Sequence, residues 1–189
     1  MKCTKFILIL LSLAFVSLGA QAQQYNTPQT RKNLIHYQGE GVTGYGIGLG
    51  ADQDAQFYVE TIHGLRFTKN FFAGVGFGYN NAIVTNDYAN RRYWESYFSV
   101  YLNLRYYFLF DKSPVSLFAS MSGGYVTSMD YAVDGYSLCP ALGISVKMRR
   151  NSSINISVGY DFQDWVANYT WDGDSFDNKA LALRVGFSF

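Results

Sequence analysis

The strongest constraint on the fold is a strict alternation of residue types in the last eleven residues, Lys179–Phe189. From Leu181 onward every second residue is large and apolar, and the residues between are small or polar, with Arg184 as their only charge. Strict alternation predicts a β-strand with two unlike faces. The same pattern recurs upstream, so we expect the whole chain to be built from strands of this kind.

Eight segments show the alternation, and polar or turn-forming residues separate them. They are His36–Gly50, Phe57–Phe67, Phe71–Asn80, Trp94–Phe110, Val115–Tyr125, Ser137–Met148, Ser153–Gln163 and Lys179–Phe189. Connections after the second, fourth and sixth segments are short, and those after the third, fifth and seventh are longer: Asn81–Tyr93, Val126–Tyr136 and Asp164–Asn178. This order predicts an all-β fold, an eight-stranded antiparallel up-and-down barrel in which the first and last strands pair. Pro140 cannot donate to a ladder, so we expect a bulge or the rim of a strand there.

The N-terminal region has the layout of an export signal. Lys2 and Lys5 precede an apolar run, and Gly19-Ala20-Gln21-Ala22 supplies a small-residue cleavage site. We therefore expect residues 1–22 to be a signal peptide, residues 23–35 a polar N-terminal periplasmic segment, and residues 36–189 the barrel. The mature chain then keeps one cysteine, Cys139, and cannot form an internal disulfide.

Composition favours a barrel in a membrane over a soluble barrel of the lipocalin kind. Charged residues make up 15% of the chain and aromatic residues 18%, whereas soluble domains carry about 25% charged residues. A soluble barrel would cover its outside with Lys, Glu and Asp. Here the non-apolar positions are mostly Gly, Ala, Ser and Asn, which suit a crowded interior, and the apolar positions carry no charge at mid-strand. We therefore expect the apolar face to contact lipid. His63 is the one awkward residue on that face.

Seven charged residues fall on the inward positions and are predicted to form a mutually neutralising network. They are Glu40, Glu60, Asp161, Arg66, Arg105, Lys147 and Arg184. Eight strands leave an interior that side chains can fill. The inward aromatic residues Tyr58, Tyr97, Tyr101, Tyr107 and Phe118 favour a filled interior, with a narrow path for ions or small solutes as the alternative.

The sequence gives little support for catalysis or for a cofactor. The mature chain has two histidines, His36 and His63, and neither can be placed in a catalytic triad. We expect no enzyme, no cofactor and no metal site. Three aspartates, Asp172, Asp174 and Asp177, lie in the last long connection without the spacing of an EF-hand, so a solvated loop is expected there. No basic patch indicates a nucleic-acid partner.

The mature chain resembles the small porin-like outer-membrane β-barrels of Gram-negative bacteria, the "outer membrane protein beta-barrel domain" group with OmpA/OmpX-type barrels. The residues that carry the resemblance are Tyr37-Gln38-Gly39-Glu40, Gly44-Tyr45-Gly46-Ile47-Gly48, Phe71-Phe72-Ala73-Gly74-Val75-Gly76, Pro140-Ala141-Leu142-Gly143 and the ending Leu183-Arg184-Val185-Gly186-Phe187-Ser188-Phe189. The resemblance implies location in the outer membrane, contact with its lipid, and recognition by the barrel-assembly machinery through the C-terminal signal Phe187 and Phe189. It implies no catalytic motif. Three roles stay open: a structural barrel that presents its long loops to an extracellular partner, a narrow channel, and, with less support, a lipid-modifying enzyme.

Overall fold

The computed structural model describes residues 35–49, 53–86, 91–109, 113–128, 133–148, 152–167 and 175–189. Eight β-strands contain nearly all of them: β1 His36–Gly48, β2 Gln53–Arg66, β3 Phe71–Asn86, β4 Arg91–Leu109, β5 Val115–Ser128, β6 Val133–Lys147, β7 Ser153–Ala167 and β8 Ser175–Ser188. The expected signal peptide, residues 1–22, and nearly all of the predicted N-terminal segment lie outside the described residues. Within the described residues there is no helix long and apolar enough to cross a membrane.

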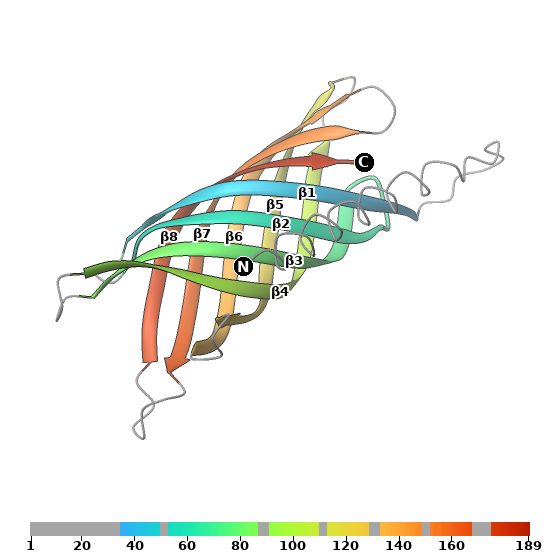
Figure 1. Ribbon diagram of the computed structural model, residues 1–189. Coiled ribbons are helices and arrows are strands. Elements are labelled where there is room, and N and C mark those ends of the chain that lie inside the picture. The colour runs from blue at the N-terminus through green and yellow to red at the C-terminus, as the bar shows by residue number, and fades with distance from the viewer. Residues whose placement is uncertain are drawn as a thin grey trace, which may run out of the picture. The chain divides into compact units, whose positions relative to one another are not determined.

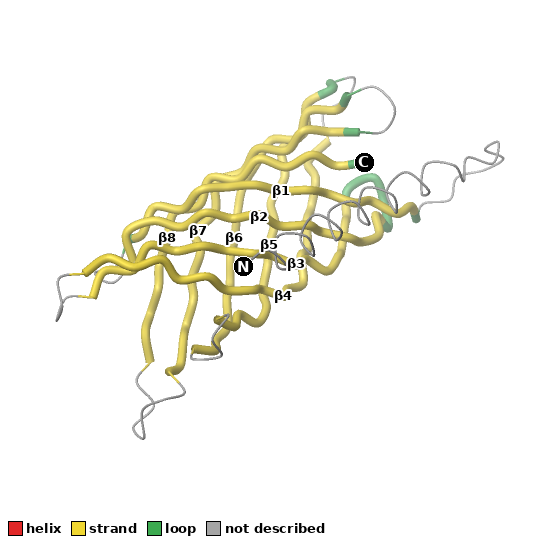
Figure 2. The backbone as a smooth tube through the Cα atoms, in the orientation of Figure 1, coloured by secondary structure: helices red, strands yellow, loops and turns green. Residues whose placement is uncertain are grey.

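The strands follow one another around a single closed antiparallel barrel (Figures 1 and 2). Each strand pairs with the next, and β1 also pairs with β8 from Glu40↔Ser188 to Gly48↔Ala180. This pairing confirms the predicted closure, which leaves no strand edge unpaired in a medium without water. We call the end where β2–β3, β4–β5 and β6–β7 connect, and where the C-terminus lies, the turn end. The opposite end is the hairpin end.

The strands run further at the hairpin end than the sequence predicted. β3 continues to Asn86 and β4 begins at Arg91, so most of the predicted loop Asn81–Tyr93 is a paired hairpin. The β5–β6 and β7–β8 hairpins likewise take up much of the predicted loops, since their ladders include Thr127↔Asp134 and Val166↔Ser175. The acidic stretch around Asp172 and Asp174 lies outside the described residues.

The outer face of the β3–β4 hairpin explains why the sequence pattern ended early. Tyr79 and Asn81 both contact Ser96, with the Tyr79 hydroxyl 3.0 Å and the Asn81 Nδ2 2.9 Å from Ser96 Oγ. The outward positions Asn81 and Ser96 are polar and interrupt the apolar alternation, although Ile83 further along β3 is apolar, and the backbone ladder continues past them. A strand that leaves the lipid needs no apolar face, so alternation marks the lipid-facing part of a strand and not its end.

The expectation for Pro140 was wrong. Pro140 lies in the middle of β6, opposite Met121 of β5, and the β5–β6 register runs without a shift on both sides of it. On the other side the β6–β7 ladder pairs Leu138 with Phe162 and resumes at Ala141 with Gly159, in the same register. Proline lacks an N–H donor, so the ladder is interrupted there without a bulge.

The two faces of the barrel are divided as the sequence predicted. On β4, Leu102 is 64% exposed on the outside, while its neighbours Tyr101 and Asn103 are 6% and 3% exposed on the inside. Leu142 on β6 is 70% exposed, and large apolar side chains occupy the outward positions of all eight strands in this way. An apolar surface of this extent would be unfavourable in water and is favourable in lipid. The chain is a membrane-spanning β-barrel.

Candidate functional site: the barrel interior

The turn end of the interior is closed by an aromatic cluster on which one arginine is stacked. Val42, Ile62, Phe72, Tyr101, Tyr107 and Phe118 form this cluster. The Arg105 guanidinium lies 4.6 Å from the centre of the Phe118 ring, and Arg105 Nη1 donates to Glu40 Oε2 at 2.8 Å. The Asn155 amide donates to the other Glu40 oxygen at 2.7 Å. We call these residues the turn-end plug.

Inward glycines make room for the plug rings. A Cβ atom at Gly64 or at Gly74 would lie 2.8 Å from Phe72 Cζ. Such a distance is shorter than any normal contact, so the Phe72 ring can pack there only because both positions lack a side chain. The glycines on the inward positions were noted as small residues, but the sequence could not indicate which ring each one accommodates.

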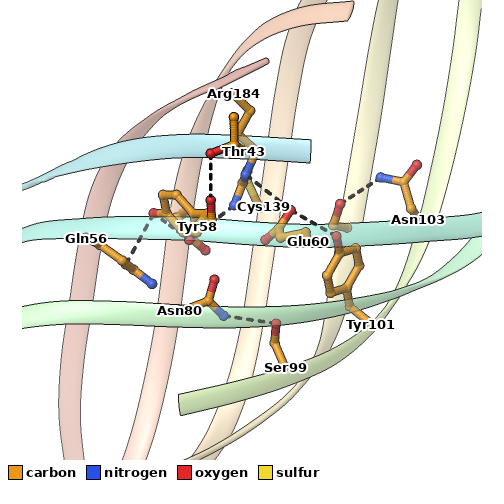
Figure 3. Close-up of polar contacts among 12 residues, drawn as sticks. Thr43, Gln56, Tyr58, Glu60, Asn80, Ser99, Tyr101, Asn103, Cys139 and Arg184 are labelled. Carbon is orange, nitrogen blue, oxygen red and sulfur yellow. Dashed lines mark hydrogen bonds and ion pairs between the residues drawn. The ribbon is translucent and has the colours of Figure 1, made fainter. Parts of the chain in front are cut away.

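Arg184 lies inside the barrel near Glu60 and Cys139 (Figure 3), and it contacts two carboxylates. Its Nε lies 3.7 Å from Glu60 Oε2, and its Nη2 lies 3.5 Å from Asp161 Oδ2. Its Nη1 donates to Cys139 Sγ at 2.8 Å. Tyrosine hydroxyls hold the acids in place, since Tyr101 donates to Glu60 at 3.0 Å and Tyr58 donates to Asp161 at 3.1 Å.

The hairpin end of the interior is closed by a second cluster, Ala82, Tyr97 and Val126. Tyr97 is fully buried, and it pairs across the ladder with Asn80. Beside it, Gln56 Oε1 lies 3.2 Å from the Tyr58 hydroxyl oxygen, and Gln56 is 1% exposed. We call this group the hairpin-end plug. It separates the middle of the interior from the end of the barrel.

Five of the seven predicted network charges take part in the two groups of ion pairs. Arg66 and Lys147 do not. Arg66 stacks 4.0 Å from the centre of the Tyr107 ring and donates to the Lys69 carbonyl at 2.8 Å, so it lies at the rim of the turn end. Lys147 is exposed at the end of β6, and among the described residues it forms no ion pair.

A set of buried amides on the inward face was not predicted as part of the site. Asn80, Asn103 and Asn155 are each 3% exposed. In the sequence, these residues could be recognised only by their place among the inward-facing positions of three strands. Cys139 was noted only as unable to form a disulfide, yet it lies against Arg184 in the middle of the barrel.

His63 does lie on the lipid-facing side, and two hydroxyl groups occupy its ring nitrogens. The Tyr37 hydroxyl is 2.5 Å from Nδ1 and Thr61 Oγ1 is 2.9 Å from Nε2. Both partners are side chains of the same face, which lets an imidazole sit near the lipid boundary with its polar atoms paired. His36 is exposed at the start of β1.

The C-terminal residue closes the seam between β1 and β8. Phe189 and Gly39 exchange two backbone hydrogen bonds, of 3.1 Å and 2.9 Å. The Phe189 ring covers Gly39, since a Cβ atom there would lie 2.7 Å from Phe189 Cε2. Phe187, the other residue of the predicted assembly signal, is 48% exposed toward the lipid, with its ring centre 6.5 Å from that of Phe189.

Comparison with known proteins supports the fold. No protein-family model and no curated protein matches the sequence. Neisserial surface protein A superposes with a TM-score of 0.58 at 12% identity, over 82% of this chain and 95% of that one. The outer membrane protein AlkL, determined by solid-state NMR in lipid bilayers, superposes with a TM-score of 0.52 at 14% identity, over 87% of this chain and 94% of that one. The chain therefore has the fold of the small outer-membrane β-barrels, and its apolar outer belt is consistent with that location.

Proposed function

We propose that this outer-membrane barrel has a closed interior and serves to anchor its hairpins in the membrane and present them at the cell surface. The observation that carries the proposal is the pair of plugs. A solute entering from the turn end would meet Phe72, Tyr107, Phe118 and the Arg105–Glu40 pair. One entering from the hairpin end would meet Tyr97 and Gln56, both almost completely buried.

With the interior closed and the outer face in lipid, the hairpins are the part of the molecule that can bind a partner. On β3 the first polar outward contacts lie at Tyr79 and Asn81, and the strand continues for seven residues beyond Tyr79 to Asn86. At about 3.3 Å per residue this is a paired arm of roughly 20 Å along the strand. Arms of this kind are stiffer than free loops, which reduces the entropy lost when a partner binds. We propose an extracellular partner for these hairpins and the barrel-assembly machinery as the partner of the C-terminal strand.

We also propose that the protein is not an enzyme. Among the described residues, His63 is the histidine best placed for acid–base chemistry, and its partners are the hydroxyls of Tyr37 and Thr61. Both ring nitrogens face hydroxyl groups on the outer face of the barrel, away from the buried carboxylates of the interior, and this arrangement does not resemble a catalytic triad.

Conductance across a planar bilayer tests the closed interior. The wild-type protein should give no stable unit channels, because both plugs must open for an ion to pass. A variant with the plug rings removed, Tyr97→Ala/Phe118→Ala, should conduct if it folds. Stable wild-type channels whose conductance changes in Arg105→Ala or Arg184→Ala would support the narrow-channel alternative and reject the closed barrel.

Surface presentation has its own test. An epitope inserted between residues 87 and 90 should be recognised by its antibody on intact cells. The matched insertion between Lys69 and Asn70, in the turn that precedes β3, should be recognised only after the outer membrane is opened. Recognition of the second insertion on intact cells would show that the barrel is oriented the other way.

A further inference from the structure

A small polar cavity lies between the two plugs. Its volume is about 50 Å³ for the centres of water-sized molecules. One water needs about 10–15 Å³ by this measure, so the space admits several waters or one ion with part of its hydration shell. Glu40, Glu60, Asp161, Arg105 and Arg184 all contribute to its wall.

The charges in this wall do not balance. Glu40 is matched by Arg105 at 2.8 Å. Arg184 is shared between Glu60 and Asp161 at the longer distances of 3.7 Å and 3.5 Å. Arg66 does not supply the missing charge, because it lies beyond the Tyr107 ring at the rim. Among the described residues one buried negative charge is therefore left over near Glu60 and Asp161, and such a charge is unfavourable unless something neutralises it.

The cavity also has an excess of oxygen acceptors. The Oδ1 atoms of Asn80, Asn103 and Asn155 are buried and have no hydrogen-bond partner, and all three residues line the cavity. For Asn155 the orientation is fixed, because its amide nitrogen donates to a Glu40 carboxylate oxygen and to Ser188 Oγ, both at 2.7 Å. The amides of Asn80 and Asn103 donate to Ser99 and Ser122 at 3.0 Å and 2.8 Å.

From these two deficits we propose that the cavity binds one monovalent metal cation, such as Na⁺ or K⁺, with its remaining waters. The cation supplies the missing positive charge, and the cation and its waters supply partners for the three amide oxygens. A single unmatched charge and neutral oxygen ligands suit a monovalent ion better than Ca²⁺ or Zn²⁺, which favour several carboxylates or His and Cys ligands. In agreement, the described residues contain no group of three or more His, Cys, Asp and Glu side chains arranged to hold a metal.

The cation dependence of stability tests this site. The barrel is folded in a zwitterionic detergent and its thermal unfolding is followed in NaCl, KCl and choline chloride at equal ionic strength. When a cation binds only the folded state and its concentration is well above its Kd, each further tenfold increase in concentration lowers the equilibrium constant of unfolding about tenfold. We expect a higher melting temperature in NaCl or KCl than in choline chloride, because choline is too large for the cavity.

Two variants separate the site from general salt effects. Asp161→Asn removes the unmatched charge and should abolish the difference between the salts. Asp164→Asn, three residues along β7 and exposed, should keep it. Equal wild-type melting temperatures in all three salts would overturn the proposal, as would an unchanged salt response in Asp161→Asn.

A proton is the competing neutraliser, and it gives a different result. In that case the melting temperature would rise at lower pH by the same amount in all three salts, and metal cations would add nothing at any pH, which would overturn the proposal. If Asp161→Asn does not fold, crystals of the wild-type protein soaked in Rb⁺ decide the question. Anomalous density inside the cavity is expected, and its absence would reject the site.

Discussion

The Glu40–Arg105 pair is the part of the turn-end plug whose energetic role can be measured most cleanly. Both side chains are almost completely buried, at 2% and 5% exposure, and their charged atoms are 2.8 Å apart. Arg105→Met keeps an unbranched chain against the Phe118 ring but leaves the Glu40 carboxylate without its partner. The Asn155 amide still donates to it, yet it brings no charge.

Removing one member of a buried ion pair costs about 3–5 kcal/mol, because the other charge is left uncompensated. We therefore expect Arg105→Met and Glu40→Gln each to lower the free energy of unfolding by an amount in this range. The double variant Glu40→Gln/Arg105→Met contains no buried charge at this site, so its loss should be smaller than that of either single variant.

The assay is urea unfolding of the barrel in lipid vesicles, followed by tryptophan fluorescence and by the mobility difference between heated and unheated samples on gels. Lys147→Met is the control, since Lys147 is exposed and its loss should change stability by less than about 0.5 kcal/mol. Losses in the double variant equal to the sum of the single losses would show that the two charges do not interact, and would refute the reasoning.

Two further changes test the seam and the lipid face. Gly39→Leu places a side chain where the Phe189 ring lies and should destabilise the barrel by about 1–3 kcal/mol in the same urea assay. Gly41→Ala is the control and should be tolerated, because no atom lies within 4 Å of a Cβ added at that position. Equal effects of the two substitutions would refute the role given to Phe189. Val100→Arg introduces a charge on the exposed outer face of β4 and should lower the free energy of unfolding in vesicles by about 2–4 kcal/mol. Tyr136→Arg, near the hairpin end, should lower it by less than about 1 kcal/mol. If Val100→Arg left the stability unchanged, that face of the barrel would lie outside the bilayer.

Most of the fold could be predicted from the sequence, because lipid on one side and a crowded interior on the other impose a strict alternation. Tyr101 was assigned to the interior from its position alone, and its neighbour Leu102 lies on the opposite face, as strict alternation requires. The ends of the strands could not be predicted in this way. Beyond Tyr79 the regular apolar alternation is broken by the outward Asn81, and no pattern distinguishes a paired hairpin from a loop.

The site could be predicted only as a set of residues. Alternation placed seven charges on the inward side, but it could not give the height of each one, that is, its position along the barrel axis. Height decides that Arg184 lies between Glu60 and Asp161 and that Lys147 lies at the rim. Pairing of this kind depends on contacts between strands far apart in the sequence, and the sequence of one chain does not specify them.

Reaction of Cys139 with a charged methanethiosulfonate reagent tests the closed interior most directly. Cys139 is the only cysteine outside the expected signal peptide, and it is 4% exposed in the middle of the barrel. In the folded protein Cys139 should stay unmodified, whereas it should react fully after unfolding, and Lys147→Cys in a Cys139→Ser background should react when folded. Modification of Cys139 in the folded barrel as fast as this control would contradict a closed interior.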